Sequence, residues 1–95
     1  MRFSLSGLIT EDLAIDLGTA HTYIASRGRG LVVNEPTLVA IDRNDGEVVA
    51  VGNEALEMLG RSSEEIEIRS PLEDGVVSDF ELTAKMLSSY IRKAR

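Results

Sequence analysis

The sequence lacks several residues on which common functional sites depend. It has no cysteine, which excludes disulfides, thiolate metal sites and cysteine nucleophiles. It has one histidine, so a zinc site built from several histidines is excluded as well. Tryptophan is absent and aromatic residues make up only 4% of the chain. The core must therefore be built from Val, Leu, Ile, Ala and Met.

The chain is also poor in positive charge and in long apolar segments. Ten basic residues against sixteen acidic ones give a net charge of −6. Because a nucleic-acid binder needs a basic face, we expect no nucleic-acid partner. No apolar run approaches the roughly 20 residues of a membrane-spanning helix, and the N-terminus does not have the form of a secretory signal peptide. The length of 95 residues allows one small domain.

The most informative stretch is residues 13–22, which has the form of a buried strand followed by a glycine turn. Asp16 interrupts the apolar run, and such a charge is costly to bury unless it is paired, hydrated or bound to a metal ion. Gly18 lets the backbone turn sharply, and N–H groups after such a turn can hold an anion. Thr19 and Thr22 add hydroxyl groups. The stretch predicts a nucleotide phosphate with a hydrated Mg²⁺ ion, while the alternative is a tight turn in which Asp16 only caps backbone groups.

The order of the remaining elements predicts strands first and helices later. Apolar runs joined by glycine turns indicate strands over residues 22–26, 31–33, 38–41 and 48–51. Arg27 and Arg29, in the first of these turns, are expected to be solvated. A short helix is expected over residues 54–59, with Asn53 as its cap and Gly60 at its end.

A longer helix is expected to follow near the C-terminus. Ser78 and Glu81 have the spacing of a capping box, which predicts that the helix begins there. An apolar stripe repeats at helical spacing and is interpreted as the packing face. The residues of this stripe are Phe80, Ala84, Leu87, Ile91 and Ala94.

Nearly the whole chain resembles the N-terminal part of the MreB-like bacterial actins. Residues 12–20, DLAIDLGTA, are similar to a motif shared by the wider actin, Hsp70 and sugar-kinase superfamily. Residues 28–36, GRGLVVNEP, also carry the resemblance. Its Asn-Glu-Pro segment, residues 34–36, and residues 71–81, PLEDGVVSDFE, narrow the resemblance to MreB-like actins. Residues 49–52, VAVG, and residues 58–61, MLGR, agree with it.

The resemblance implies an α/β fold of the actin-like, or ribonuclease H-like, kind. The expected piece is the N-terminal subdomain, with a mixed five-stranded sheet, a short helix and a long C-terminal helix, incomplete relative to the full family fold. Residues 1–11 would be an N-terminal tail or a membrane-surface anchor. Residues 12–95 would form a partial actin-like ATPase subdomain.

The resemblance also implies a binding site for ATP and Mg²⁺. Asp16 would orient water around Mg²⁺ beside the ATP phosphates. Gly18, Thr19, Ala20 and His21 would form the first phosphate loop, mainly through backbone N–H groups. His21 stands where the family usually has Asn, so the backbone donor is retained while the side chain differs.

The family resemblance further implies a cytoskeletal role. Such proteins hydrolyse ATP, form filaments on the inner face of the cytoplasmic membrane and position cell-wall elongation proteins. The expected partners are thus further copies or full-length MreB, elongation proteins and the membrane, with the protein cytoplasmic or peripheral to that membrane. Phosphoryl transfer needs groups from several sides, and family members are several times longer, so we expect no ATPase activity from this chain alone. The alternative is a truncated, non-enzymatic module that binds full-length MreB or the membrane.

Overall fold

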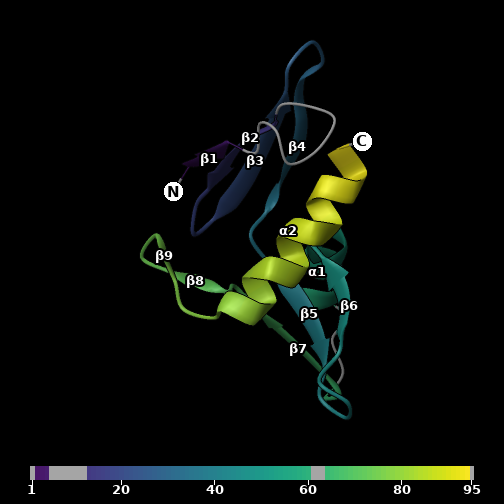
Figure 1. Ribbon diagram of the computed structural model, residues 1–95. Coiled ribbons are helices and arrows are strands. Elements are labelled where there is room, and N and C mark those ends of the chain that lie inside the picture. Colours follow the sequence, from purple (N-terminus) through teal and green to yellow (C-terminus); the bar gives the residue numbers. More distant parts are fainter. Residues whose placement is uncertain (1, 5–12, 61–63, 95) are drawn as a thin grey trace.

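The computed structural model describes residues 2–4, 13–60 and 64–94, and Figure 1 shows two sheets with a long helix beside them. The molecule is elongated, with principal extents of 42 × 23 × 21 Å. One sheet has four strands in the order β1-β2-β3-β4, which are Arg2–Ser4, Leu13–Leu17, His21–Ser26 and Gly30–Pro36. The other has the order β6-β5-β7, which are Val48–Val51, Val39–Asp42 and Ile66–Arg69.

The helices and a small hairpin complete the described fold. Helix α1 (Asn53–Leu59) follows β6, and its buried Ala55 packs against Ala40 and Ala50 of the three-stranded sheet. The hairpin β8–β9 (Leu72–Glu73 and Val76–Val77) leads into helix α2 (Phe80–Ala94). The expected α/β class, with a short helix followed by a long one, is confirmed.

The expected strands are present, but they are not arranged in one mixed five-stranded sheet. In the described part of the chain every strand pair is antiparallel, and β5 and β6 belong to a second sheet. The connections explain the difference. Short turns join β2 to β3, β3 to β4 and β5 to β6, whereas a parallel neighbour needs a crossover of about a dozen residues or more.

Part of the expected N-terminal tail is paired with the sheet. Residues 2–4 form β1, which runs antiparallel to β2 with Arg2 opposite Asp16. The other residues of the 1–11 segment lie outside the described residues. The membrane-surface anchor therefore stays a prediction.

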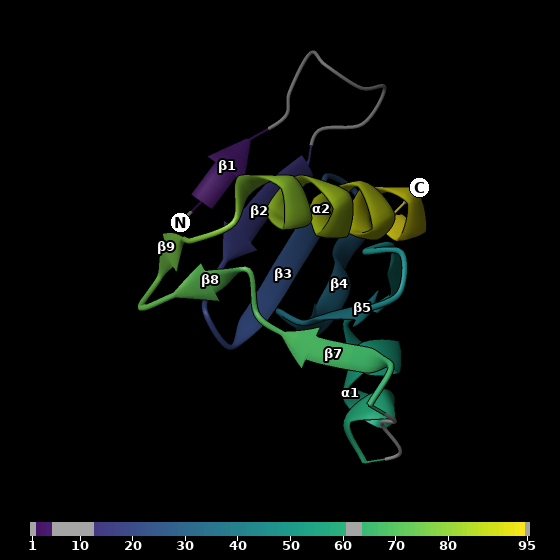
Figure 2. The same cartoon turned by 90° about the horizontal axis from the view of Figure 1, so that it is seen from below.

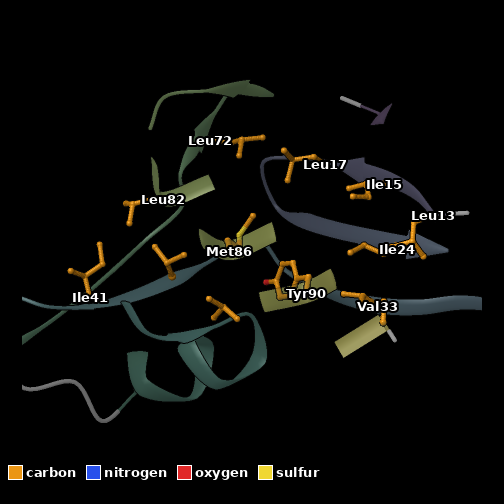
Figure 3. Packing of buried hydrophobic residues seen from close by; sticks show 13 residues of the cluster. Leu13, Ile15, Leu17, Ile24, Val33, Ile41, Leu72, Leu82, Met86 and Tyr90 are labelled. Carbon is orange, nitrogen blue, oxygen red and sulfur yellow. The ribbon is translucent and has the colours of Figure 1, made fainter. Parts of the chain in front are cut away.

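The main core lies between the four-stranded sheet and α2. Figure 2 shows α2 running across β2, β3 and β4, and Figure 3 shows the side chains that meet there. Alternate residues of β2 point toward the helix, so Leu13, Ile15 and Leu17 are almost completely buried. On α2 the buried apolar residues recur at i, i+4 spacing, and they are Leu82, Met86, Tyr90 and Ala94, with Thr83 buried beside them.

The buried face of α2 is therefore not the predicted stripe. Phe80 is 79% exposed and Ala84 is exposed, while Leu87 and Ile91 lie only at the margin of the core. Ala94 is the one residue of the predicted stripe that is buried. The helix is apolar around much of its circumference, so spacing alone did not decide which stripe packs. The larger side chains of Met86 and Tyr90 fill the space beneath the sheet.

The N-terminal end of α2 is held by a residue other than the predicted ones. Asp79 is the N-cap: the Leu82 N–H donates to its Oδ1 (3.0 Å), and the Thr83 hydroxyl donates to its carbonyl oxygen (2.7 Å). The Ser78 hydroxyl instead donates to the Pro71 carbonyl (3.0 Å), so the predicted capping box is wrong. At the other end the Arg29 guanidinium donates to the Ala94 carbonyl.

The two sheets and α2 meet at the carboxylate of Glu35. This side chain is 12% exposed and accepts hydrogen bonds from Lys93 Nζ (3.1 and 3.0 Å) and from the Asn53 N–H (3.1 Å). Beside it the Tyr90 hydroxyl donates to the Pro36 carbonyl (2.6 Å). Burial, and then the negative charge of Glu35, raise the pKa of Tyr90 above its ordinary value. The tyrosine therefore remains a neutral donor.

Because Gly52 has no side chain, Glu35 and Tyr90 can pack directly against its backbone. Its φ is +62°, and an added Cβ would lie 2.2 Å from Glu35 Oε1 and 2.8 Å from the Tyr90 hydroxyl oxygen. Gly52 is also the N-cap of α1, which has no side-chain cap, so the expected capping role of Asn53 is wrong. Asn53 takes part through its backbone N–H alone.

We expect Gly52→Ala to lower the free energy of unfolding by about 2–4 kcal/mol, because overpacking and a left-handed backbone both oppose a Cβ. Urea unfolding followed by circular dichroism measures the change. Gly60→Ala is the matched control, since Gly60 has a φ of −80° and the nearest atom to its added Cβ is 3.9 Å away. The control is expected to change stability by less than about 1 kcal/mol. Equal losses in the two variants would contradict this account.

We expect Asp79→Ala to destabilise the protein by about 1 kcal/mol through loss of the helix cap. Asp79→Asn keeps an acceptor for the Leu82 N–H and should retain most of the stability. Glu81→Ala removes the other predicted member of the capping box, which is exposed and pairs with Lys85 (3.5 Å). Its effect should stay within about 0.5 kcal/mol. Thermal unfolding of the three variants decides between the caps, and a larger loss from Glu81→Ala would restore the capping box.

Candidate functional site

The predicted site residues lie together in the turn between β2 and β3. Asp16 is near the end of β2, His21 begins β3, and Gly18, Thr19 and Ala20 lie between them. The Gly18 N–H donates to the His21 carbonyl (3.0 Å) and closes the turn. The predicted strand, glycine turn and second strand are confirmed.

Gly18 is required for space at this turn. It is not among the glycines with positive φ, but an added Cβ would lie 3.0 Å from the His21 carbonyl oxygen. Its own N–H is already used to close the turn. Gly18 therefore permits close approach of the backbone, and donors for an anion must come from the residues after it.

Hydrogen bonds from neighbouring segments fix the peptide planes of the turn. The Thr37 hydroxyl donates to the Gly18 carbonyl (2.6 Å), and the Ser70 hydroxyl donates to the Thr19 carbonyl (3.3 Å). In a planar trans peptide the N–H points opposite to the carbonyl, and the described chain has no cis peptide. The N–H groups of Thr19 and Ala20 therefore point away from these two supports. Two adjacent amide donors in a fixed turn are suited to hold an anion.

The hairpin β8–β9 is a third support of the turn. The Gly75 N–H donates to the hydroxyl oxygen of Thr19. Asp74, just before it, has a φ of +51° and is the one non-glycine residue with positive φ among those described. This tight turn presents the Gly75 N–H to Thr19. The hairpin within residues 71–81 thus contacts the turn at Thr19.

The predicted roles of two threonines do not match the structure. Thr22, expected to offer a hydroxyl to the site, is completely buried, and its hydroxyl lies 2.9 Å from that of Thr37. Strand alternation explains this, because Thr22 is opposite Leu17 on the core face. Thr37 was not predicted as a site residue, yet its N–H also donates to the Ala20 carbonyl (3.0 Å). In the sequence, Thr37 could have been recognised as a hydroxyl residue directly after Glu35-Pro36, where a strand ends.

Asp16 lies on the face of the sheet that is turned away from α2. The neighbouring Ile15 and Leu17 point into the core, so Asp16 points outward, opposite Tyr23 on β3. Its side chain is partly exposed beside a small hollow of about 140 Å³. The hollow is lined by Ala14, Asp16, Tyr23, Ala25 and Leu31. A carboxylate in this position remains accessible to water.

The groups at this turn suit a metal ion that keeps most of its water better than one bound directly by several side chains. Among residues 13–60 and 64–94, no three acidic or histidine side chains come together to hold a metal ion. Mg²⁺ usually keeps several waters and is bound by one or two carboxylates together with substrate phosphates. One outward carboxylate beside fixed amide donors therefore fits Mg²⁺ held through water. The residues present are compatible with a magnesium–phosphate group at this turn.

His21 adds an aromatic side chain beside the turn. It is exposed, and its ring stacks on that of Tyr23 with centroids 5.9 Å apart and an interplanar angle of 21°. Residues 21 and 23 of one strand point to the same face, which is the face that carries Asp16. The imidazole is therefore held on the outer face of the sheet.

A larger hollow lies elsewhere and shares no residue with the turn. It measures about 460 Å³ and is open to solvent. It lies between residues 47–51 with Glu54 on one side and the α2 residues Ala84, Lys85, Ser88, Ser89 and Arg92 on the other. Its size alone does not make it the site, because the donor groups described above are at the turn.

No helix in the described ranges is long and apolar enough to cross a membrane.

Known proteins were compared with the chain as a whole. Residues 10–95 match the family described as MreB/Mbl protein. The chain is 51% identical over 86 residues to the cell shape-determining protein Mbl of Bacillus cereus, which covers 90% of this chain and 26% of that protein. It is 45% identical over 91 residues to the cell shape-determining protein MreB of Escherichia coli, covering 92% and 26% respectively.

The solved structures agree with these relatives. The fold is similar to that of MreB5 of Spiroplasma citri bound to AMPPNP, with a TM-score of 0.75 and 35% sequence identity. The similarity covers 81% of this chain and 23% of that chain. The expected actin-like fold is thereby confirmed, and the chain spans about a quarter of the length of the curated relatives it matches. With the family matched over residues 10–95 and the fold shared with a solved MreB, the chain belongs to the MreB/Mbl family.

Proposed function

We propose that the chain is the phosphate-binding N-terminal part of an MreB-type cytoskeletal protein and that the turn of residues 18–21 binds the phosphates of ATP with Mg²⁺. The observation that carries this proposal is the fixed orientation of the turn. Thr37 and Ser70 hold its carbonyl groups from one side, so the N–H groups of Thr19 and Ala20 point to the other.

Each residue of the turn has a separate role in this proposal. The N–H groups of Thr19 and Ala20 donate to phosphate oxygens, and Gly18 allows the phosphate to approach the backbone. His21 continues the loop into β3, and Asp16 orients water around the metal ion. Bound Mg²⁺ would neutralise part of the phosphate charge. The rigid turn needs little rearrangement on binding, which favours affinity.

The role of the whole protein follows from its relatives. Two of them are described as cell shape-determining proteins, Mbl and MreB. We propose that the longer protein forms ATP-dependent filaments at the inner face of the cytoplasmic membrane. Its partners there would be further copies of itself and cell-wall elongation proteins. The net charge of −6 supports partners other than nucleic acid.

The chain by itself offers only part of an ATPase site. Phosphoryl transfer depends on groups placed around the phosphate from several sides, including one that orients the attacking water. The turn supplies one side, with the carboxylate of Asp16 near the end of β2. Binding without turnover is therefore the activity we propose for residues 1–95.

We expect the purified chain to bind Mg-ATP saturably in calorimetry and to lose at least about tenfold in affinity in Asp16→Asn, because the carboxylate orients the hydrated metal. Chelation of Mg²⁺ should weaken binding to wild type and leave the variant almost unchanged. Asp45→Asn is the matched control, since Asp45 lies in the distant β5–β6 turn, where its Oδ1 accepts the Glu47 N–H (2.9 Å). Equal affinity of all three folded proteins would exclude Asp16 from the site.

We expect no Mg-dependent release of phosphate from ATP by the same 95-residue protein, since the turn of residues 18–21 and Asp16 approach the phosphate from one side, whereas phosphoryl transfer needs groups from several sides. A phosphate-release assay at saturating Mg-ATP measures this directly. Turnover that is abolished by Asp16→Asn and retained by Asp45→Asn would contradict the prediction. Turnover that is equal in all variants would indicate a contaminating enzyme.

A further inference from the structure

We infer that the hydroxyl of Tyr90 is a positioning group for the turn of residues 18–21 and acts on it through the peptide group between Pro36 and Thr37. The inference rests on the proposed function and extends it, because that function takes the orientation of Thr37 as given. Tyr90 belongs to α2, which lies on the face of the sheet opposite to Asp16. Phosphate binding on one face would then depend on a side chain packed against the other.

The peptide group that joins Pro36 to Thr37 is held from two sides. Its carbonyl oxygen accepts the hydroxyl of Tyr90 (2.6 Å), and its N–H donates to the Ala20 carbonyl (3.0 Å). In a trans peptide the carbonyl and the N–H point in opposite directions, and the described chain has no cis peptide. The donor on α2 and the acceptor in the turn therefore lie on opposite sides of one rigid plane. A rotation of this plane that breaks one hydrogen bond also misaligns the other.

The side chain of Thr37 carries this orientation further into the turn. It is completely buried, and its hydroxyl donates to the Gly18 carbonyl (2.6 Å). Because threonine is branched at Cβ, its χ1 angle is restricted, so the direction of the hydroxyl follows the backbone at this residue. Thr37 thus holds two carbonyl groups of the turn, those of Gly18 and Ala20. The Gly18 carbonyl shares its peptide plane with the N–H of Thr19, one of the two proposed phosphate donors.

Tyr90 is suited to hold this peptide group because its own position is fixed. The side chain is completely buried in the main core, where Figure 3 shows its ring among the other buried side chains. Its hydroxyl lies beside the backbone of Gly52, where an added Cβ would be only 2.8 Å away. Close packing holds core side chains in single rotamers. The hydroxyl is therefore a donor with a fixed position relative to α2.

Loss of this hydroxyl would release the peptide group without leaving its carbonyl unpaired. The Pro36 carbonyl also accepts the Leu38 N–H (2.9 Å). That hydrogen bond joins residues two apart in one short segment, so it moves with the segment and does not attach it to another element. In Tyr90→Phe the carbonyl keeps this partner while the link to α2 is lost. We therefore expect the variant to fold and its turn to be less firmly oriented.

The test compares wild type, Tyr90→Phe and Thr83→Val as full 95-residue chains, each checked for folding by circular dichroism. Thr83 is the matched control on α2: its buried hydroxyl donates to the Asp79 carbonyl (2.7 Å), which also accepts the Thr83 N–H (3.0 Å). Each variant removes one hydroxyl and leaves its acceptor with a backbone donor. In calorimetry the affinity for Mg-ATP should fall about fivefold in Tyr90→Phe, the order of one net hydrogen bond, and less than about twofold in Thr83→Val.

Amide NMR signals provide a second readout, because they report local orientation in the folded protein. Without ligand, Tyr90→Phe should shift the amide signals of Thr19 and Ala20, whereas Thr83→Val should leave them in place. Phenylalanine keeps the aromatic ring, so such a shift reports the lost hydrogen bond rather than a lost ring. In wild type, saturating Mg-ATP should by the same coupling shift the amide signal of Thr37 and the ring signals of Tyr90. This last measurement needs no variant.

Three results would overturn the inference. If Tyr90→Phe binds Mg-ATP as tightly as wild type while Asp16→Asn binds more weakly, the hydroxyl does not position the turn, but the phosphate site stands. Equal losses of affinity in Tyr90→Phe and Thr83→Val would assign the effect to a general weakening of α2. Wild-type signals of Thr37 and Tyr90 that stay in place at saturation would show that the two sites are not coupled. If wild type does not bind Mg-ATP at all, the proposed function fails together with the inference.

Discussion

The structure depends on the hydrogen bonds that anchor residues 35–37. These residues connect the end of β4 in the four-stranded sheet to β5 in the three-stranded sheet. The Glu35 carboxylate is held by Lys93 and by the Asn53 N–H, at the junction of both sheets and α2. The Pro36 carbonyl receives the Tyr90 hydroxyl. A buried carboxylate without these donors would be strongly unfavourable, so the surrounding segments are fixed with respect to each other.

The same segment connects this cluster to the candidate site. One residue beyond Pro36, Thr37 donates through its hydroxyl to Gly18 and through its N–H to Ala20. The turn is thus supported by a residue whose own position is set by Glu35 and Tyr90. Since Tyr90 lies on α2 and Asn53 on α1, the orientation of the amide donors depends on packing across the whole described fold. A displacement of α2 would reach the turn through these few hydrogen bonds.

The sequence predicted the local features well and the tertiary choices poorly. Strand β2, the turn after it and the order of the later elements follow from apolar runs, glycines and short connections. The buried stripe of α2 and the cap at Asp79 were missed, because two stripes and two polar caps satisfied the same spacing rules. The partition into two sheets and the role of Thr37 depend on contacts between residues far apart in the chain, such as Tyr90 with Pro36. No local pattern contains that information.

The family resemblance gains a physical meaning from these contacts. The stretches that narrowed it to MreB-like actins, residues 34–36 and 71–81, lie outside the phosphate turn in sequence. In the structure the first contains Glu35 and Pro36, and the second contains Gly75, which donates to Thr19. Both stretches therefore support the superfamily motif from outside. The motif in the sequence draws attention to Asp16 and Gly18. The geometry of their turn, however, is set by residues such as Thr37 and Ser70, which support the turn without a proposed contact to the ligand.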